Sequence, residues 1–308
     1  MKAIRYHDYG GPEVMRYEDA PKPAPANDQI LVRVYAMGVN PVDWKIREGH
    51  VRQAFQLPMP ATPGGDISGV VEQAGGGAPG FRVGDEVFAM IGLWGACAEY
   101  VCIKPAIAAL KPRTMNHLQA ASVPLAALTA WQALTEKGEL KTGQNILVHA
   151  AAGGVGQFAV QFARHMGATV VGTCSPANNE FVTGLGASAT LDYHADIYAA
   201  NKGRFDVVLD TMGGEVAIQS MSLLKPNGIL VGVARPTDKS QAAAAAAGVR
   251  TTGIMVRPDG AQLTEISRLI DAGTVKTAIA QVFPLSDIGK AHDLIKTGHT
   301  RGKIVLKA

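Results

Sequence analysis

The stretch that decides the fold is residues 146–175, with the sequence ILVHAAAGGVGQFAVQFARHMGATVVGTCS. An apolar run at 146–150 leads into a glycine-rich turn at 151–156. Apolar side chains then recur every three or four residues over 155–166, which is the spacing of one helix face. A second apolar run begins at 169. Strand, turn, helix and strand make one βαβ unit, so the stretch predicts an α/β fold with a parallel sheet.

The glycine-rich turn is suited to a dinucleotide cofactor. Glycines let the backbone approach a pyrophosphate, and the start of the following helix offers free N–H groups at its positive end. The turn lies between a strand and a helix, which is the context that the dinucleotide fingerprint requires. A purely structural turn in a parallel α/β domain is the alternative.

The end of the second strand indicates which dinucleotide is bound. NAD sites usually place an acidic residue there to hold the ribose 2′-hydroxyl. Here 173–179 reads TCSPANN, and no acidic residue precedes Glu180. Small hydroxyl and amide groups leave room for a 2′-phosphate, which favours NADPH, although the turn lacks the Arg or Lys that would balance the phosphate charge. Helix capping is the alternative role for Ser175 and Asn179.

Composition bounds the class of protein. The chain has 308 residues, enough for two domains, with 47% hydrophobic and 18% charged residues. A formal net charge of +3 is too small to imply a nucleic-acid partner. The N-terminal residues read as a strand rather than a signal peptide, and no apolar stretch is long enough to span a membrane. Three cysteines without disulfide or metal spacing fit a reducing compartment, so we expect a cytoplasmic protein.

The order of elements predicts an inserted domain. Residues 1–124 are rich in Gly, Pro and short β-like runs, which favours a β-rich domain. Strands and helices alternate over 125–253, which predicts a doubly wound parallel sheet, and 254–308 would return to the first domain. The strands expected in the sheet are 146–150, 169–173, 205–210 and 228–233. Outside it we expect strands at 1–6, 30–35, 69–72 and 303–306, and helices at 242–247, 261–272 and 288–297.

Several motifs together resemble one enzyme superfamily. They are GVNPVD (38–43), PGGDISG (63–69), VGDEV (83–87), AEY (98–100), LTAW (128–131), DTMGG (210–214) and GKIVL (302–306). In these motifs the chain resembles the medium-chain dehydrogenase/reductase superfamily, and within it the zinc-independent quinone oxidoreductase (zeta-crystallin-like) family. The resemblance implies a GroES-like β-rich catalytic domain, a Rossmann domain, a cleft between them and a homodimer.

The zinc ligands of related alcohol dehydrogenases are missing. Those enzymes have a cysteine where Asn40 stands and a His-Glu pair where Gly65 and Asp66 stand. Their structural zinc lobe has no counterpart, and the eight histidines show no ligand spacing with a Cys or carboxylate partner. We therefore expect no metal site, and we expect His149 to be a buried or hinge residue.

Without a Lewis acid, the substrate must delocalise its own negative charge. A quinone, or the C=C bond of an α,β-unsaturated carbonyl, accepts hydride and spreads the charge into a phenolate or enolate, which a few hydrogen-bond donors can stabilise. The sequence therefore predicts an NADPH-dependent reductase of quinones or enones. An enoyl-thioester reductase and a non-catalytic NADPH-binding protein are the alternatives.

The resemblance also implies site residues. Asn40 and Thr129 would lie beside the nicotinamide, while Lys45 would donate to the developing oxyanion or pair with Asp43 or Asp66. A turn residue before a proline is the alternative for Asn40, and a solvated ion pair is the alternative for Lys45. The cofactor contacts carried over are Gly153, Gly154, Val155 and Gly156 at the pyrophosphate, Ser175, Asn179 and Tyr193 around the adenosine 2′-phosphate, and Gly232, Val233 and Ala234 along the nicotinamide. Ala152 and Thr173 are also expected to bind the cofactor.

Two of the contacts expected at the 2′-phosphate have alternatives. Many relatives have a lysine where Asn179 stands, and Tyr193 could instead be a packing aromatic.

Candidate apolar residues of the substrate pocket are Trp44, Phe55, Trp94 and Met255, although large apolar residues more often belong to the core. No general acid is evident, so water is expected to deliver the final proton.

Overall fold

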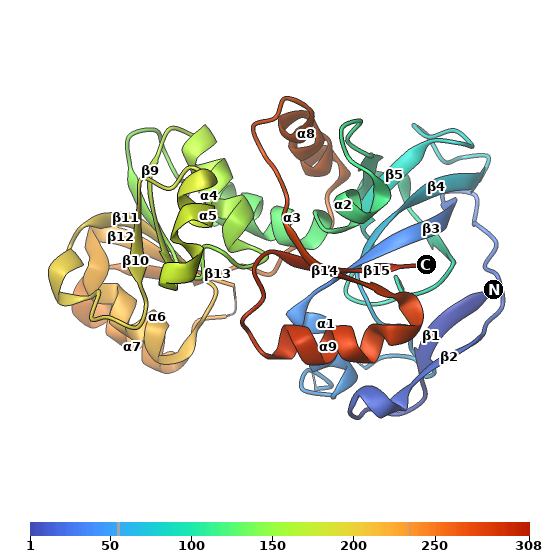
Figure 1. Ribbon diagram of the computed structural model, residues 1–308, viewed down its shortest axis with the longest axis horizontal. Coiled ribbons are helices and arrows are strands. Elements are labelled where there is room, and N and C mark those ends of the chain that lie inside the picture. The colour runs from blue at the N-terminus through green and yellow to red at the C-terminus, as the bar shows by residue number, and fades with distance from the viewer. Residues whose placement is uncertain (54–55, 234) are drawn as a thin grey trace. The chain divides into compact units, whose positions relative to one another are not determined.

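The computed structural model describes residues 1–53, 56–233 and 235–308. These residues form two compact units (Figure 1). Unit 1 contains 1–128, 257–273 and 277–308, and unit 2 contains 129–256 and 274–276. The breaks follow residues 128 and 256, whereas the sequence predicts them after 124 and 253, because helix α3 (Pro124–Gln132) runs through the first break.

Unit 1 is built on a seven-stranded sheet of order β14-β15-β3-β4-β5-β7, with β6 paired to β3. Every pair is antiparallel except β14 with β15. The strands are β3 (Ile30–Val39), β4 (Asp66–Ala74), β5 (Glu86–Met90), β6 (Tyr100–Ile103), β7 (Ala108–Leu110), β14 (Ile279–Pro284) and β15 (Lys303–Lys307). A separate hairpin joins β1 (Lys2–Tyr6) to β2 (Met15–Asp19), and the helices are α1 (Pro41–Arg47), α2 (His117–Ala121), α8 (Gly260–Asp271) and α9 (Ile288–Lys296).

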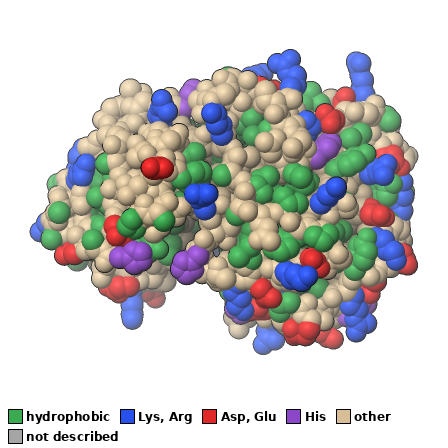
Figure 2. All heavy atoms as spheres, viewed as in Figure 1, with side chains coloured by type: hydrophobic (Ala, Val, Ile, Leu, Met, Phe, Trp, Pro, Cys, Tyr) green, Lys and Arg blue, Asp and Glu red, His purple; other side chains and the backbone are tan. Residues whose placement is uncertain are grey.

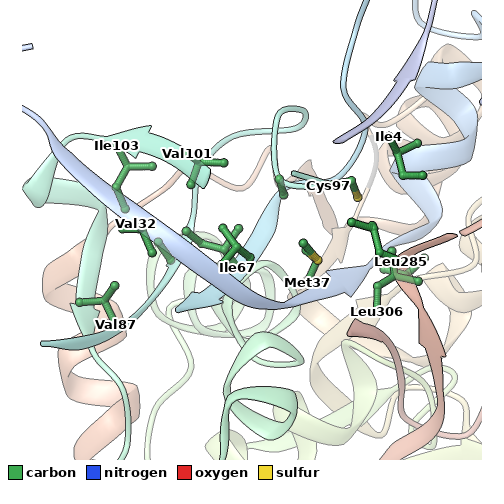
Figure 3. Close-up of a cluster of buried hydrophobic side chains, with 14 of the residues drawn as sticks. Ile4, Val32, Met37, Ile67, Val87, Cys97, Val101, Ile103, Leu285 and Leu306 are labelled. Carbon is green, nitrogen blue, oxygen red and sulfur yellow. The ribbon is translucent and has the colours of Figure 1, made fainter. Parts of the chain in front are cut away.

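Strand β3 is central to unit 1 because it contributes buried side chains to two apolar clusters. On one face, Val32 and Met37 join the main apolar cluster (Figure 3). On the other face, Ala36 packs with Ala121 of α2 and Val305 of β15. Burial of each Val, Ile or Met side chain contributes about 1.5–3 kcal/mol, so this strand anchors the elements that follow it, including the start of α1.

Unit 2 is a parallel sheet of order β10-β9-β8-β11-β12-β13. Its strands are β8 (Asn145–Val148), β9 (Thr169–Cys174), β10 (Ala189–Asp192), β11 (Phe205–Asp210), β12 (Leu224–Gly232) and β13 (Arg250–Gly253). The helices are α4 (Gly156–His165), α5 (Asn179–Gly184), α6 (Gly214–Ser220) and α7 (Asp238–Ala247). In chain order the strands run 3-2-1-4-5-6, which is the doubly wound dinucleotide-binding topology, so the expected fold class is confirmed.

Two properties of the described residues bear on partners. No helix in residues 1–53, 56–233 and 235–308 has the length and apolar character of a membrane span. Cationic and anionic side chains are scattered together over the face in Figure 2, as the net charge of +3 suggests.

Candidate cofactor and catalytic sites

The glycine turn (residues 151–156) is braced from the neighbouring strand. Ala150, two residues after β8, has a φ of +47°, and this turns the chain out of the sheet. Its N–H donates to Thr173 Oγ1 at 3.1 Å, and the Ala151 N–H donates to the Thr173 carbonyl at 2.9 Å. Thr173 is buried, so it supports the turn from inside unit 2.

The glycine turn also fits a pyrophosphate. A Cβ on Gly156 would lie 2.2 Å from the Ala150 carbonyl oxygen, so only glycine allows this close packing. The N–H groups of Gly154 and Val155 have no acceptor among the residues that the structure describes. They precede α4, a helix of ten residues, whose N-terminus carries a partial positive charge. Free donors at such a terminus form an anion site.

The other predicted contacts of unit 2 lie at the same sheet edge, because the carboxyl ends of parallel strands meet there. Gly232 ends β12, and the Val233 N–H donates to the Asp210 carbonyl at 2.9 Å. Ala234 lies outside the described residues. Cys174 pairs with Asp192 at the ends of β9 and β10, so Ser175 and Tyr193 follow neighbouring strand ends.

Ser175 Oγ accepts from Asn178 Nδ2 at 3.1 Å and makes no helix-capping bond. Asn179 lies in the first turn of α5 and accepts from the Cys174 thiol at 3.4 Å. Tyr193 is 49% exposed and lies against the ring of His194, with 4.2 Å between centroids. The sequence interpretation missed Asn178 and His194, which adjoin predicted contacts at this edge.

His149 is buried, as expected, and is held by two hydroxyl groups. Nε2 lies 2.8 Å from Ser220 Oγ and Nδ1 lies 3.2 Å from Thr173 Oγ1. Burial lowers the pKa of His149, although the nearby Asp210 opposes the shift. The His149 imidazole is therefore neutral and connects Thr173 to Ser220 inside unit 2.

In unit 1, four buried polar residues form a cluster that we call the Asn40 cluster: Asn40, Asp43, Asp66 and Lys303. Asn40 is the N-cap residue of α1, is only 2% exposed and donates its backbone N–H to Asp43 Oδ2 at 2.7 Å. Its Nδ2 donates to Asp66 Oδ2 at 2.8 Å, and its Oδ1 accepts from the Lys303 ammonium. Both ends of the carboxamide are therefore bonded.

The Asn40 cluster is tied to the surrounding backbone. Lys303 Nζ also donates to the Val39 carbonyl at 3.0 Å, and its distance to Asp66 Oδ2 is 3.8 Å. Asp66 Oδ1 accepts from the Leu125 N–H at 2.8 Å. The cluster thus connects β3, β4, β15 and the start of α3.

Burial changes the protonation of the Asn40 cluster. Desolvation raises the pKa of Asp43 to about 7, and the Asn40 N–H opposes this shift while the Asp66 carboxyl adds to it. Desolvation also raises the pKa of Asp66, to about 6, although Lys303 opposes it. The pKa of Lys303 is lowered by burial and held up by both carboxyls. Asp43 Oδ1 is buried and has no hydrogen-bond partner within the described part of the chain.

Lys45 does not belong to the Asn40 cluster. It is exposed and lies over the Trp44 ring, 5.6 Å from its centroid. The expectation that it pairs with Asp43 or Asp66 is wrong, because Lys303 occupies that position beside Asp66. Thr129, in unit 2, is buried in α3.

The candidate pocket residues differ in exposure. Trp94 and Met255 are exposed large apolar side chains, Met255 by 64%, while Trp44 is half-buried. Phe55 lies outside the described residues. Exposure of two of these side chains argues against the alternative that they belong to the core.

One position that holds a zinc ligand in related alcohol dehydrogenases has no space for a side chain in this structure. A Cβ at Gly65 would lie 2.4 Å from the Gly92 carbonyl oxygen, so no ligand side chain fits there without a backbone shift. Within residues 1–53, 56–233 and 235–308, no group of three or more His, Cys, Asp or Glu could hold a metal ion.

Comparison with known proteins identifies two family models along the chain. A family model described as alcohol dehydrogenase GroES-like domain matches residues 26–113, and one described as zinc-binding dehydrogenase matches residues 185–306. The chain is 34% identical to 2-methylene-furan-3-one reductase of Solanum lycopersicum, over 99% of this chain and 79% of the relative. It is also 34% identical to the chloroplastic NADPH-dependent alkenal/one oxidoreductase of Arabidopsis thaliana, with the same coverage.

Solved structures of quinone oxidoreductases have the same fold as this chain. The quinone oxidoreductase from Coxiella burnetii has a TM-score of 0.92 and 36% identity, covering 100% of this chain and 99% of that one. Escherichia coli quinone oxidoreductase in complex with NADPH has a TM-score of 0.88 and 27% identity, covering 100% of both chains.

Proposed function

Because the chain belongs to the quinone oxidoreductase family of medium-chain dehydrogenases/reductases, we propose that it uses NADPH to reduce a quinone or the C=C bond of an α,β-unsaturated carbonyl. The observation that carries the proposal is the glycine turn at the switch point of a dinucleotide-binding sheet, where the N–H groups of Gly154 and Val155 find no acceptor in the described part of the chain. The relatives named for enone and quinone reduction support the substrate class.

NADPH, when bound, supplies the hydride. We propose that the glycine turn holds its pyrophosphate with the N–H groups of Gly154 and Val155. At the neighbouring strand ends, Ser175, Asn178 and Tyr193 offer hydroxyl and amide groups to a 2′-phosphate. Position 175 is a serine rather than an acidic residue that would repel the phosphate, which supports preference for NADPH over NADH.

The protein's remaining task is to stabilise negative charge on the substrate oxygen. Asn40 has one amide hydrogen beyond the one bonded to Asp66, and we propose that it donates this hydrogen to the substrate oxygen or to the cofactor ribose. Thr129 is proposed as a second donor. Lys45 is exposed and makes no ion pair with the residues described, so its ammonium is a third candidate.

We also propose a cytoplasmic homodimer. The three cysteines are free thiols, which fits a reducing compartment. Light scattering should then give about twice the chain mass of 32.2 kDa, and the mass of one chain would contradict the dimer. Fractionation of cells that express the protein should find it with the soluble cytoplasmic proteins; recovery with membranes or outside the cytoplasm would contradict the localisation.

The decisive experiment compares NADPH oxidation with a quinone, a short enal, an enone, an enoyl thioester and, in reverse, simple alcohols. A hydroquinone or a saturated carbonyl product supports the proposal. Turnover of the enoyl thioester alone would favour the thioester reductase, and NADPH binding without turnover would favour a non-catalytic role. Rapid alcohol oxidation with neither product would mean that the reaction is wrong although the fold is right.

A further inference from the structure

We propose that Lys303 and Asp66 are positioning residues that hold the Asn40 carboxamide in one orientation, with a single amide hydrogen left to donate to substrate or cofactor. This inference rests on the proposed function, in which Asn40 acts at the reacting groups. It assigns a reaction-related role to Lys303, the lysine of the GKIVL motif at 302–306.

The chemistry of the two partners determines the orientation of the amide. An ammonium group can only donate hydrogen bonds, and an ionised carboxylate can only accept them. Lys303 therefore selects the oxygen of the Asn40 side chain, and Asp66 selects its nitrogen. If the amide rotated by half a turn, its NH2 would face the ammonium and its oxygen would face the carboxylate. Both contacts would be repulsive inside a buried site.

The two positioning residues are themselves fixed. Lys303 also donates to the Val39 carbonyl at 3.0 Å, one residue before Asn40. Asp66 also accepts from the Leu125 N–H at 2.8 Å. Each partner therefore has a second bond to the backbone, so neither can follow Asn40 if its carboxamide moves.

A purely structural role would not require these charges. An asparagine that caps a helix needs no buried ammonium, and apolar side chains of similar volume often replace a buried ion pair without loss of stability. Lys303 is 3% exposed and Asp66 is 0% exposed, so both charges are removed from water. An ammonium on the amide oxygen polarises the amide and strengthens its remaining N–H as a donor. Such a donor is suited to negative charge that develops on a substrate oxygen.

The test is a double-mutant cycle of Lys303→Met with Asn40→Ala, and its matched control is Lys307→Met on the same strand, where the lysine is exposed. Lys303→Met should lower kcat by about 10-fold or more, since small displacements of a catalytic group are costly, while the Kd for NADPH changes by less than about twofold. Lys307→Met should change neither. In the Asn40→Ala background, Lys303→Met should produce no further fall in kcat. Additive losses, or an unchanged kcat in a folded Lys303→Met protein, would overturn the proposal.

A readout that does not need turnover is the side-chain NH2 signal of Asn40 in a ¹H–¹⁵N spectrum, assigned by its loss in Asn40→Ala. Its hydrogens should exchange with water faster in Lys303→Met than in the wild type or in Lys307→Met; equal rates would contradict positioning. If Lys303→Met does not fold, Lys303→Met/Asp66→Asn removes both charges and should give the same two results. A wild-type protein that reduces none of the acceptors would refute the proposed function, whereas the exchange rates would still decide the orientation of Asn40.

Discussion

The glycine turn of unit 2 and the Asn40 cluster of unit 1 present their donors in different ways. The glycine turn uses backbone N–H groups, and its close packing depends on the absence of side chains at residues such as Gly156. The Asn40 cluster uses a side-chain amide oriented by charged side chains, joined by hydrogen bonds between residues 26 and 263 positions apart. The glycine turn is therefore formed by residues close together in the sequence, whereas the Asn40 cluster forms only after the sheet of unit 1 has formed.

The largest effect should come from adding one methyl group to the glycine turn. Gly156→Ala places a Cβ 2.2 Å from the Ala150 carbonyl oxygen, so the turn must move and the free N–H groups move with it. We expect the Kd for NADPH to rise by about 100-fold or more, equivalent to about 2.7 kcal/mol, in a fluorescence titration. Gly184→Ala is the control, because nothing lies within 4 Å of its Cβ. Equal binding by both variants would mean that the glycine turn does not hold the pyrophosphate.

A charge at the end of β9 should change which cofactor is preferred. We expect the wild type to bind NADPH more tightly than NADH by roughly 1–3 kcal/mol. Ser175→Asp should reverse this order, because its carboxylate repels the 2′-phosphate and accepts from the ribose hydroxyl. Ser175→Ala, which adds no charge, should weaken NADPH binding without improving NADH binding. Identical Kd values of the wild type for both cofactors would exclude the preference.

In unit 1, the corresponding test is how the stability of the protein depends on pH. Asp43 has a pKa of about 7 in the folded protein against an ordinary value of 3.8, so the folded state retains a proton that the unfolded state releases. Its contribution therefore lowers the free energy of unfolding as pH rises from about 4 to about 7.

Asp43→Asn removes this titration. The Tm of the variant minus that of the wild type should increase by a few degrees across that interval and then level off. Asp8→Asn, at an exposed position, should show no such trend. A flat difference for Asp43→Asn would show that Asp43 ionises normally.

The smallest expected effect on activity is that of removing metal ions. Asn40 and Gly65 stand where related enzymes have zinc ligands, and Gly65 has no room for a side chain. Prolonged dialysis against a chelator should leave the rate of NADPH oxidation unchanged. Activity that is lost on dialysis and restored by zinc would contradict the expected metal independence.

The sequence predicted unit 2 well because its signals are local. The strands expected at 146–150, 169–173, 205–210 and 228–233 are β8, β9, β11 and β12. The first ends earlier than expected because Ala150 already has a positive φ. The short strands β10 and β13 were missed, since their polar sequences ATLD and RTTG lack the apolar run of a buried strand.

The partners in the Asn40 cluster could not be predicted from the sequence. Lys45 is close to Asp43 in the chain, which suggested an ion pair, but it lies over Trp44 instead. Lys303 reaches Asn40 because β15 pairs with β3 in a register that places Ile304 opposite Val39. One local signal was present: a lysine that opens the apolar strand KIVLK would be expected to bury its charge beside an acidic partner.

The place of β15 in unit 1 has a consequence for biosynthesis. Ribosomes release a chain from its N-terminus, so Lys303 emerges long after the β3 strand that it must meet. Unit 2 is nearly continuous in sequence and lies between them, so we expect it to fold first, while residues 36–39 of β3 still lack the partner strand β15. Chains stalled before β15 should therefore show a protease-resistant unit 2 and a digestible unit 1; equal resistance of both would contradict this order. Chaperones that shield open strand edges would then act chiefly on the part of the protein made first.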